Sequence, residues 1–215
     1  MARIITMAQQ KGGAGKTTLA AHLAAHWAAQ CRVAVVDIDP QASLSGWHRV
    51  RQARGGLPPI HLAQISGWRT AMEVERLSRN FDIVLVDSPP HAATEARIAV
   101  RAADLVVVPV QLSPMDLWAT GATIELAIAE RRRIVLVLNR VAPRSNLATV
   151  IRAQIAEKAI PLTETTLGNR QGFAAALLDG MGVTESEPDS VAAEEVKALA
   201  AELLQRLPAE PALSS

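Results

Sequence analysis

The stretch that decides the fold is Gln10-Lys11-Gly12-Gly13-Ala14-Gly15-Lys16-Thr17-Thr18. It follows a short apolar run, residues 4–8, and precedes an Ala/Leu-rich segment with helical spacing. Glycines lack a Cβ, so the backbone N–H groups of such a loop can close around an anion, and the N-terminus of the following helix adds partial positive charge. Strand, glycine-rich loop and helix in this order therefore predict a phosphate-binding loop.

Two side chains at the end of the loop make the prediction more specific. Lys16 is placed to reach the β- and γ-phosphates of a nucleotide, and the Thr17 hydroxyl is placed to bind Mg²⁺. The alternative is a turn that is glycine-rich by chance. The spacing Gly15-Lys16-Thr17 favours the nucleotide loop, because these residues stand where the geometry requires them.

The loop departs from the ordinary pattern G-x-x-x-x-G-K-[ST] at its start. Gln10 replaces the first glycine and is followed by a second lysine, Lys11. Lysine is rare here, with four in the chain against eighteen arginines, so two within one loop are notable. Lys11 resembles the signature lysine of the deviant Walker A ATPases, the SIMIBI-class group that includes the ParA partition proteins and MinD. The resemblance implies that Lys11 reaches across a dimer interface to the partner's nucleotide.

Composition sets broad limits. A chain of 215 residues with 49% apolar and 20% charged residues suits one globular domain, which we expect over residues 1–207 with a flexible tail at 208–215. The formal charge of +1 excludes neither nucleic acids nor proteins as partners. The single cysteine, Cys31, cannot form an internal disulfide, which favours a reducing cytoplasm. No signal-peptide pattern is present, and no apolar run approaches the length of a membrane span.

Apolar runs alternate with helical patterns along the chain. The predicted strands are residues 4–8, 32–37, 60–63, 82–87, 104–110, 133–139 and 161–165. The predicted helices are residues 17–29, 43–52, 69–79, 94–102, 114–130, 146–158, 170–179 and 190–207. Several strands are apolar throughout, as in a parallel sheet covered on both faces. The predicted fold class is α/β, a doubly wound, mostly parallel sheet between helix layers, with ligands at the carboxyl ends of its strands.

Three aspartates fall at such strand ends. Asp87 follows the run Ile-Val-Leu-Val in the Walker B arrangement, in which a carboxylate holds Mg²⁺. The alternative for Asp87 is a turn or a helix N-cap. Asp37 and Asp39 are both candidates for orienting the attacking water, and the chemistry alone does not rank them. The stretch Asp37-Ile38-Asp39-Pro40-Gln41 resembles the D-x-D-P-Q switch of the ParA family, which implies that Asp39 orients the water, with Asp37 nearer the Mg²⁺ shell.

Two further stretches resemble the ParA family. The segment from Pro109 to Leu117 matches P-V-x-x-S-x-x-D-L, which lies at the dimer face in that family; the alternative is an ordinary strand-to-helix turn. Asn139 ends a predicted strand at the family's adenine-reading position, and the alternative is a strand-end cap. The implied nucleotide-binding residues are Lys11, Gly12, Gly13, Ala14, Gly15, Lys16, Thr17, Thr18 and Asn139, the implied catalytic residues are Lys11, Lys16 and Asp39, and the implied metal ligands are Thr17, Asp39 and Asp87.

Charge is unevenly distributed. Residues 140–170 carry five cations and two acids, whereas residues 185–210 carry seven acids and two cations. Basic residues without interleaved aromatics suit phosphate contact rather than base reading, although ordinary solvated surface is the alternative. Because ParA dimers bind DNA without sequence preference, the resemblance implies DNA contacts in this region. The candidates are Arg140, Arg144, Arg152 and Arg170.

The resemblance covers residues 3–207 and is strongest to small plasmid-type ParA proteins without an N-terminal helix-turn-helix domain. It implies an ATPase that uses ATP and Mg²⁺, dimerises on ATP, binds DNA of any sequence and sits on the nucleoid in the cytoplasm. A ParB-like or centromere-binding partner would stimulate hydrolysis, and the cargo would be a plasmid, a chromosome or a protein body. The alternatives are a MinD-like membrane-positioning ATPase, disfavoured by the acidic last helix, and a small-molecule enzyme of the dethiobiotin-synthetase kind.

Overall fold

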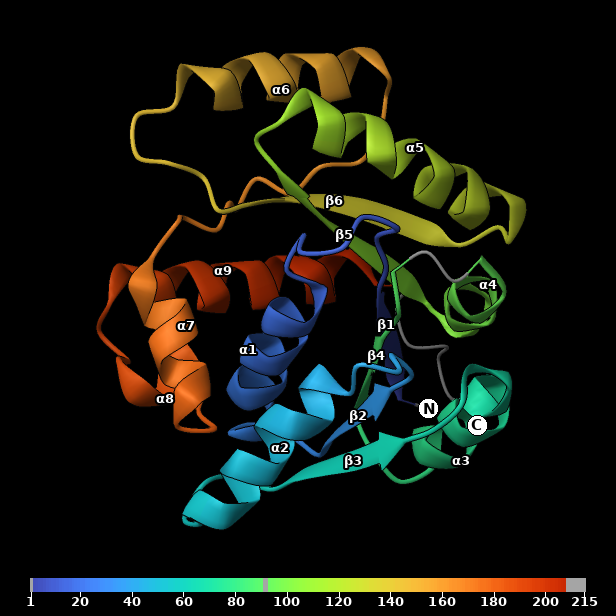
Figure 1. Ribbon diagram of the computed structural model, residues 1–215, viewed down its shortest axis with the longest axis vertical. Coiled ribbons are helices and arrows are strands. Elements are labelled where there is room, and N and C mark those ends of the chain that lie inside the picture. The colour runs from blue at the N-terminus through green and yellow to red at the C-terminus, as the bar shows by residue number, and fades with distance from the viewer. Residues whose placement is uncertain (1, 91–92, 208–215) are drawn as a thin grey trace, which may run out of the picture.

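A single sheet organises the computed structural model, which describes residues 2–90 and 93–207. Within these residues six parallel strands lie in the order β3-β2-β4-β1-β5-β6 (Figure 1). The strands are β1 (Arg3–Met7), β2 (Val33–Asp37), β3 (Ile60–Gln64), β4 (Ile83–Asp87), β5 (Leu105–Gln111) and β6 (Arg133–Asn139). The strand β1, which leads into the glycine-rich loop, is therefore central.

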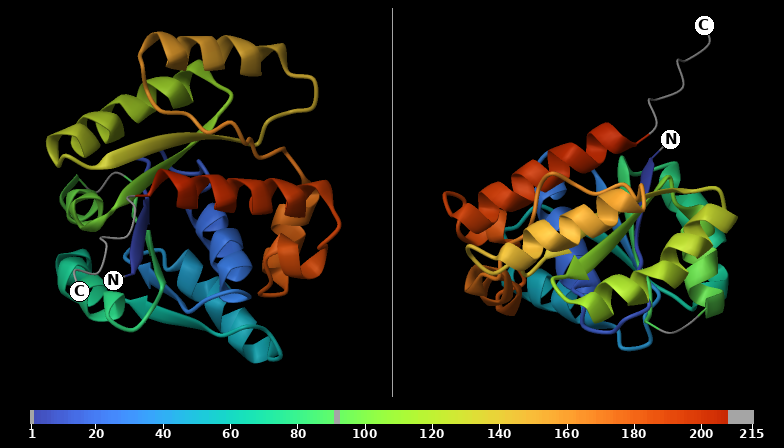
Figure 2. Two further views of the ribbon diagram at one scale, coloured as in Figure 1. Left: turned by 180° about the vertical axis from the view of Figure 1, so that it is seen from behind. Right: turned by 90° about the horizontal axis from the view of Figure 1, so that it is seen from above.

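Helices cover both faces of the sheet (Figures 1 and 2). One layer holds α1 (Lys16–Ala28), α2 (Ser43–Arg54), α7 (Gln171–Leu178), α8 (Val183–Ser186) and α9 (Val191–Arg206). The other layer holds α3 (Thr70–Ser78), α4 (Ala93–Ala102), α5 (Pro114–Ala129) and α6 (Asn146–Glu157), with the short 3₁₀ helix η1 (Gly67–Arg69) before α3. The prediction of an α/β, doubly wound fold with a sheet between two helix layers is confirmed.

Successive side chains along each strand point to opposite faces of the sheet, so the core has one part under each helix layer. In β4, Ile83 and Leu85 pack toward α1 and α9, whereas Val84 and Val86 pack toward α3 and α4. All four side chains are nearly inaccessible to solvent, which explains why the strand is apolar throughout rather than alternating. Helix α1 lies at the centre of its layer, and its alanines let it pack closely against the sheet and its neighbouring helices.

Most predicted elements are present, with ends that shift by one or two residues. The strand expected at residues 161–165 is wrong: this segment makes only an isolated bridge between Leu162 and Leu136 of β6. Helices η1 and α8 were not predicted, and the tail expected at 208–215 lies outside the described residues. No helix in the described part of the chain is long and apolar enough to cross a membrane.

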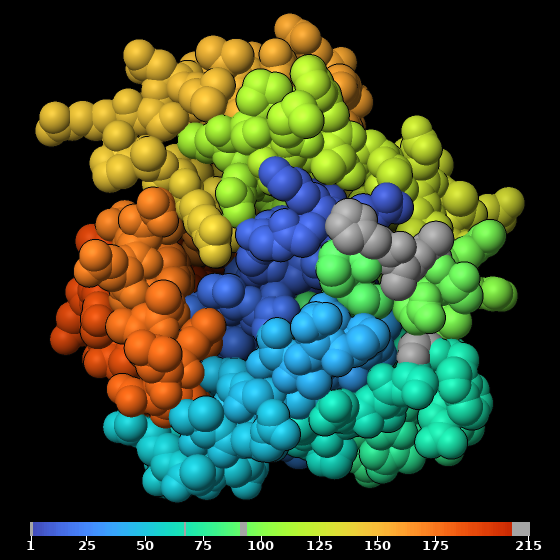
Figure 3. Space-filling model, viewed as in Figure 1, coloured from blue at the N-terminus to red at the C-terminus, as the bar shows by residue number. Residues whose placement is uncertain are grey.

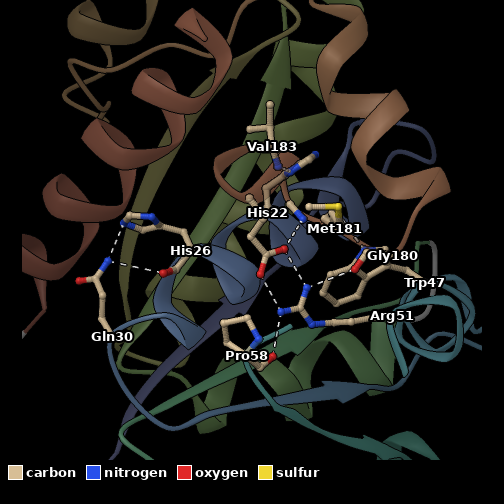
Figure 4. Close-up of polar contacts among 11 residues, drawn as sticks. His22, His26, Gln30, Trp47, Arg51, Pro58, Gly180, Met181 and Val183 are labelled. Atoms are coloured by element: carbon tan, nitrogen blue, oxygen red, sulfur yellow. Dashed lines mark hydrogen bonds and ion pairs between the residues drawn. The ribbon is translucent and has the colours of Figure 1, made fainter. Parts of the chain in front are cut away.

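The segment from α7 to α8 is fixed to α1 and α2 by buried polar contacts (Figure 4). The buried Arg51 of α2 forms an ion pair with Glu185 at 2.7 Å and donates to the carbonyls of Gly180 and Pro58. Gly180 has a positive φ of 68°, and a Cβ there would lie 2.3 Å from the backbone nitrogen of Arg51. Only glycine permits this approach, so Gly180 and Arg51 together hold α7 beside the phosphate loop.

Candidate nucleotide site

The loop between β1 and α1 has the shape that its glycines predict. Gly13 and Gly15 have φ angles of +77° and +100°, a region that other residues rarely adopt. A Cβ on Gly15 would also lie 2.3 Å from Nδ2 of Asn139. Gly15 is therefore required twice, once for its backbone angle and once for the side chain against it.

Asn139, at the end of β6, supports this loop directly. Its Nδ2 donates to the carbonyl of Ala14 at 2.9 Å, and its Oδ1 accepts the backbone N–H of Arg140 at 2.9 Å. An amide side chain has two N–H donors and an oxygen with two lone pairs. These two bonds use one of each, so Asn139 keeps one N–H and one lone pair for another partner. Asn139 therefore supports the loop. Its remaining N–H and lone pair could still bind adenine, as the sequence predicts.

Lys16 is buried at the start of α1, and its Nζ donates to the carbonyl of Gln9 at 3.1 Å. Burial lowers the pKa of Lys16, while the nearby carboxylates of Asp87 and Asp39 oppose this shift. These neighbours place an ammonium between the loop and the acidic strand ends, where the phosphate chain of a nucleotide is expected.

Thr17 and Asp87 meet as the sequence predicts. The Thr17 hydroxyl donates to Oδ2 of Asp87 at 2.6 Å, while the fully buried Oδ1 of Asp87 has no hydrogen-bond partner among the described residues. Burial raises the pKa of Asp87 to about 7, although the hydrogen bond from Thr17 opposes this shift. A buried carboxylate with a free oxygen beside a hydroxyl fits Mg²⁺, whose charge would neutralise phosphate oxygens and restore Asp87 to its ionised form.

Asp37 supports the loop that carries Asp39. Its Oδ1 accepts the backbone N–H of Asp39 at 3.1 Å, and its Oδ2 accepts both the N–H and the hydroxyl of Ser45, at 2.8 and 2.7 Å. Asp37 therefore holds the first turn of α2 and the Asp39 loop, and its expected place near the Mg²⁺ shell stays a prediction. Within the described residues, no group of three or more His, Cys, Asp or Glu side chains is arranged to hold a metal.

Asp39 faces a cavity of about 600 Å³ beside the loop. Its Oδ1 accepts the backbone N–H of Gln41 at 2.9 Å, and the side chain is half-buried. Gly12, Lys16 and Thr17 line the same cavity. In Figure 3 the loop, coloured dark blue, is exposed in the centre of one face, between α7, α5 and α2. This position suits a carboxylate that orients water at a γ-phosphate.

Lys11 is engaged within its own chain. Its Nζ lies 2.7 Å from Oδ2 of Asp116 in α5, and the Lys11 side chain is 41% exposed whereas that of Asp116 is 3% exposed. The other oxygen of Asp116 is buried with no partner in the described chain. Gln111, at the end of β5, donates to the carbonyl of Gly13 at 2.8 Å. The stretch from Pro109 to Leu117 therefore touches the loop at two points.

A second cavity of about 590 Å³ continues from the loop past Asn139. Leu167, Phe173 and Leu177 give it apolar walls, and Thr18 lies at its phosphate end. An apolar slot between the loop and α7, with the Asn139 amide at its edge, has the chemistry to hold a base and ribose.

The four arginines expected at DNA are not alike. Arg140 lines both cavities, and Arg170 forms an ion pair with Glu195 at 2.6 Å. Arg152 donates to the backbone carbonyls of Thr163 and Glu164. Arg144 is exposed, and its side chain has no hydrogen bond or ion pair within the described chain. Of the four, Arg140 and Arg144 thus have side chains without a hydrogen bond or ion pair in the described part of the chain.

Some functional contacts were not predicted from the sequence. The pairing of Lys11 with Asp116 joins residues 105 apart, and the bond from Gln111 to Gly13 spans 98. The only signal was the resemblance of the stretch holding Gln111 and Asp116 to a family motif. Ser45, which binds Asp37, had no signal at all because serine in the first turn of a helix is common.

Comparisons with known proteins show which proteins this chain resembles. Residues 5–183 match the family described as the CobQ/CobB/MinD/ParA nucleotide binding domain. The chain is 35% identical to the maintenance of carboxysome distribution protein A of Gloeobacter kilaueensis, covering 85% of this chain and 84% of that one. It is 30% identical to the chromosome-partitioning ATPase Soj of Thermus thermophilus, covering 95% and 96%.

Solved structures share the fold at low identity. The septum site-determining protein MinD of Pyrococcus horikoshii, complexed with Mg-ADP, superposes with a TM-score of 0.79 at 21% identity, covering 94% of this chain and 96% of that one. An ATP complex of a Cyanothece McdA variant superposes with a TM-score of 0.76 at 18% identity, with the same coverage.

Proposed function

The chain belongs to the CobQ/CobB/MinD/ParA family of nucleotide-binding domains, and from this premise we propose that it is a positioning ATPase that works as an ATP-dependent dimer on DNA. The observation that carries the proposal is the position of Lys11, beside the phosphate loop and 41% exposed. A small-molecule enzyme of the same fold needs no lysine there, whereas a dimer that shares its nucleotides does.

The nucleotide would lie along the two cavities, with its base between Asn139 and α7 and its phosphates on residues 12–18. Thr17 and Asp87 would hold Mg²⁺, which supplies charge neutralisation at the phosphates. Lys16 would bind the phosphate oxygens, and Asp39 would orient the attacking water. Gly13 and Gly15 keep the backbone N–H groups of the loop directed at the phosphates.

In the dimer, Lys11 of each subunit would leave Asp116 and reach the phosphates bound to the other subunit. Met115 and Trp118 in α5 flank Asp116 and are 64% and 67% exposed. Both lie next to Lys11's partner, so a second copy facing the loop would cover them. They support a dimer face along the first turns of α5.

DNA of any sequence would bind the ATP dimer, and a partner protein on the cargo would stimulate hydrolysis and release. Relatives at comparable identity carry names for both kinds of cargo, carboxysomes and chromosomes. From these names we infer that the protein distributes a cargo. The cargo would be either a protein body or a DNA molecule. The location would be the nucleoid.

The test uses Asp39→Ala protein, in which slow hydrolysis should preserve the ATP state. With ATP and Mg²⁺, light scattering should give twice the monomer mass, and two unrelated duplex DNAs should bind equally well. With ADP, both signals should be lost. Dimerisation without DNA binding but with binding to anionic vesicles would favour a membrane-positioning role. Nucleotide binding with neither would favour a small-molecule enzyme.

A further inference from the structure

Arg140 stands where the two cavities of the candidate nucleotide site meet. Four of the described residues line both cavities, namely Gly15, Thr18, Arg140 and Leu177, and Arg140 is the charged one among them. The base is proposed to lie in one cavity and the phosphates in the other, so the junction is where the α-phosphate joins the nucleoside. A cation at this point would face the first phosphate of the chain.

The side chain of Arg140 is available to a ligand. It is exposed and makes no hydrogen bond or ion pair within the described part of the chain. Among the described residues, two further lysine or arginine side chains line the cavities, and both are engaged. Arg170 pairs with Glu195 at 2.6 Å, and Nζ of Lys16 donates to the carbonyl of Gln9 at 3.1 Å. The guanidinium of Arg140 keeps all five of its N–H donors for a bound molecule.

The backbone around Arg140 is fixed on both sides. Oδ1 of the preceding Asn139 accepts the N–H of Arg140 at 2.9 Å, and the following Val141 forms a bridge with Gly168. Arg140 itself has a φ of +54°, a left-handed conformation that costs residues other than glycine some stability. Because Asn139 also donates to the carbonyl of Ala14, the same side chain holds Arg140 beside the phosphate loop.

We propose that Arg140 binds the α-phosphate of the nucleotide, and that it belongs to the nucleotide site instead of the DNA surface expected from the sequence. The proposal rests on the proposed function and adds a residue to its nucleotide site. A guanidinium donates two parallel hydrogen bonds to phosphate oxygens. Because ATP and ADP share the α-phosphate, this contact holds the nucleotide equally before and after hydrolysis.

The first test measures the affinity for ADP with Mg²⁺ by calorimetry. Arg140→Ala should weaken ADP binding roughly tenfold, because the charge-assisted hydrogen bonds to the α-phosphate are lost. Arg140→Lys should recover part of this affinity, since an ammonium binds phosphate as a point charge.

Arg131→Ala is the matched control for this measurement. Arg131 is exposed, has the same φ of +54° and lies before the other end of β6, outside both cavities. Its substitution removes the same charge from the same backbone conformation, so Arg131→Ala should bind ADP as the wild type does.

The second test separates binding from folding. Glycine adopts a positive φ without strain, so Arg140→Gly should keep or raise the melting temperature of the nucleotide-free protein. The same variant should lose as much ADP affinity as Arg140→Ala. Arg131→Gly should also keep or raise the melting temperature and should bind ADP normally. A lower melting temperature of Arg140→Gly would mean that the side chain supports the fold, and it would overturn the proposal.

The third test compares ATP with ADP in the Lys11→Ala background, in which each subunit is expected to bind nucleotide without dimerising. Adding Arg140→Ala should lower the affinities for ATP and ADP by the same factor. A loss for ATP alone would put the guanidinium at the γ-phosphate and overturn the assignment.

The ADP titration also tells the two proposals apart. If the wild type binds ADP and Arg140→Ala binds it equally well, the role of Arg140 is overturned and the proposed function stands. Unchanged ADP affinity with weaker DNA binding in Arg140→Ala would likewise overturn it and return Arg140 to the DNA surface. A wild type that binds neither ADP nor ATP would remove the proposed function and the role of Arg140 with it.

Discussion

At the residue scale, the two aspartates that bracket Ile38 have separate tasks. Asp37 accepts three hydrogen bonds and is 1% exposed, whereas Asp39 accepts one and opens onto the phosphate cavity. The backbone N–H of Asp39 is itself bound by Asp37, so one carboxylate positions the loop that carries the other.

Substituting each aspartate should therefore have opposite effects. Asp39→Ala should keep the melting temperature and ATP affinity but slow hydrolysis by roughly 100-fold or more, as loss of a positioned base does. Asp37→Ala should destabilise the fold by about 2–3 kcal/mol, because it leaves buried donors of Ser45 unpaired. Thermal unfolding and phosphate-release assays on both variants measure the difference. A large stability loss in Asp39→Ala with normal turnover would reverse the assignment.

The pair of Lys11 and Asp116 predicts a second residue-scale effect. If Lys11 moves to the partner's phosphates, the buried Asp116 carboxylate loses its cation, which is costly in a site 3% exposed. Asp116→Asn should remove part of this cost and tighten the ATP dimer by roughly tenfold. Sedimentation or light scattering against protein concentration, in the Asp39→Ala background, gives the dissociation constant. Loss of the dimer would mean that Asp116 instead holds Lys11 in its active position, and Lys11→Ala is the reference for complete loss.

At the element scale, local signals were enough to predict the sheet and most helices. Apolar runs of four or more residues between helical patterns specify buried parallel strands, and the glycine-rich loop is contiguous in sequence. The segment 161–165 has the composition of a strand. Its backbone N–H groups at Glu164 and Thr165 instead donate to the Glu202 carboxylate, and Leu162 makes a single bridge to β6. Such contacts join segments far apart in the chain, so no local sequence pattern predicts them.

In the candidate site, too, residues of local motifs could be predicted from the sequence, whereas contacts between distant segments could not. Residues 11–18, Asp39 and Asp87 could be proposed from the sequence, because each lies within or directly after a strand-end motif. The partners of Lys11 and Arg170 could not, because those pairs join segments 105 and 25 residues apart. A count of charges along residues 140–170 does not reveal that Glu195 offsets Arg170.

Helix α1 also carries a pH-dependent contact. His22 is buried, and its Nδ1 accepts the N–H of Val183 at 3.0 Å (Figure 4). Its Nε2 donates to the carbonyl of Phe173 at 3.0 Å. The ring is therefore neutral, since Nδ1 must be unprotonated to accept. Burial lowers the pKa of His22 to about 4, from an ordinary value of 6.5, and protonation would break the bond to Val183.

This contact predicts acid sensitivity with a defined window. Below pH 6.5 His22 is protonated in the unfolded chain, whereas in the folded chain it stays neutral down to about pH 4. The free energy of unfolding therefore falls between pH 6.5 and pH 4, and this contribution is complete above pH 7. The loss reaches about 3 kcal/mol at pH 4. Urea unfolding at pH 7.5, 5.5 and 4.5 should show a smaller decline in stability for His22→Gln than for the wild type. Equal declines in the two proteins would contradict the assignment.

At the scale of the whole molecule, ion pairs neutralise some cations of the described chain and leave others without a carboxylate partner. Arg170, Arg206 and Arg51 each have a carboxylate partner in the α7 to α9 region. Arg144 and Lys158, at the two ends of α6, are exposed and have no carboxylate partner among the described residues. At α6 a monomer therefore offers these two charges to DNA, and a dimer doubles them.

The final prediction follows from this arrangement. In the ATP state, Arg144→Ala and Lys158→Ala should each weaken binding to every duplex alike, because phosphate contacts carry no sequence information. In a symmetric dimer each substitution removes two contacts, so the slope of log affinity against log salt should become shallower by about 1.8. Arg170→Ala should change the slope much less, since Glu195 already offsets that charge. Anisotropy titrations of two unrelated duplexes at four salt concentrations measure all three slopes. A larger change for Arg170→Ala than for Arg144→Ala would mean that the ion pair with Glu195 opens on DNA and that the contact surface lies along α7 and α9 rather than α6.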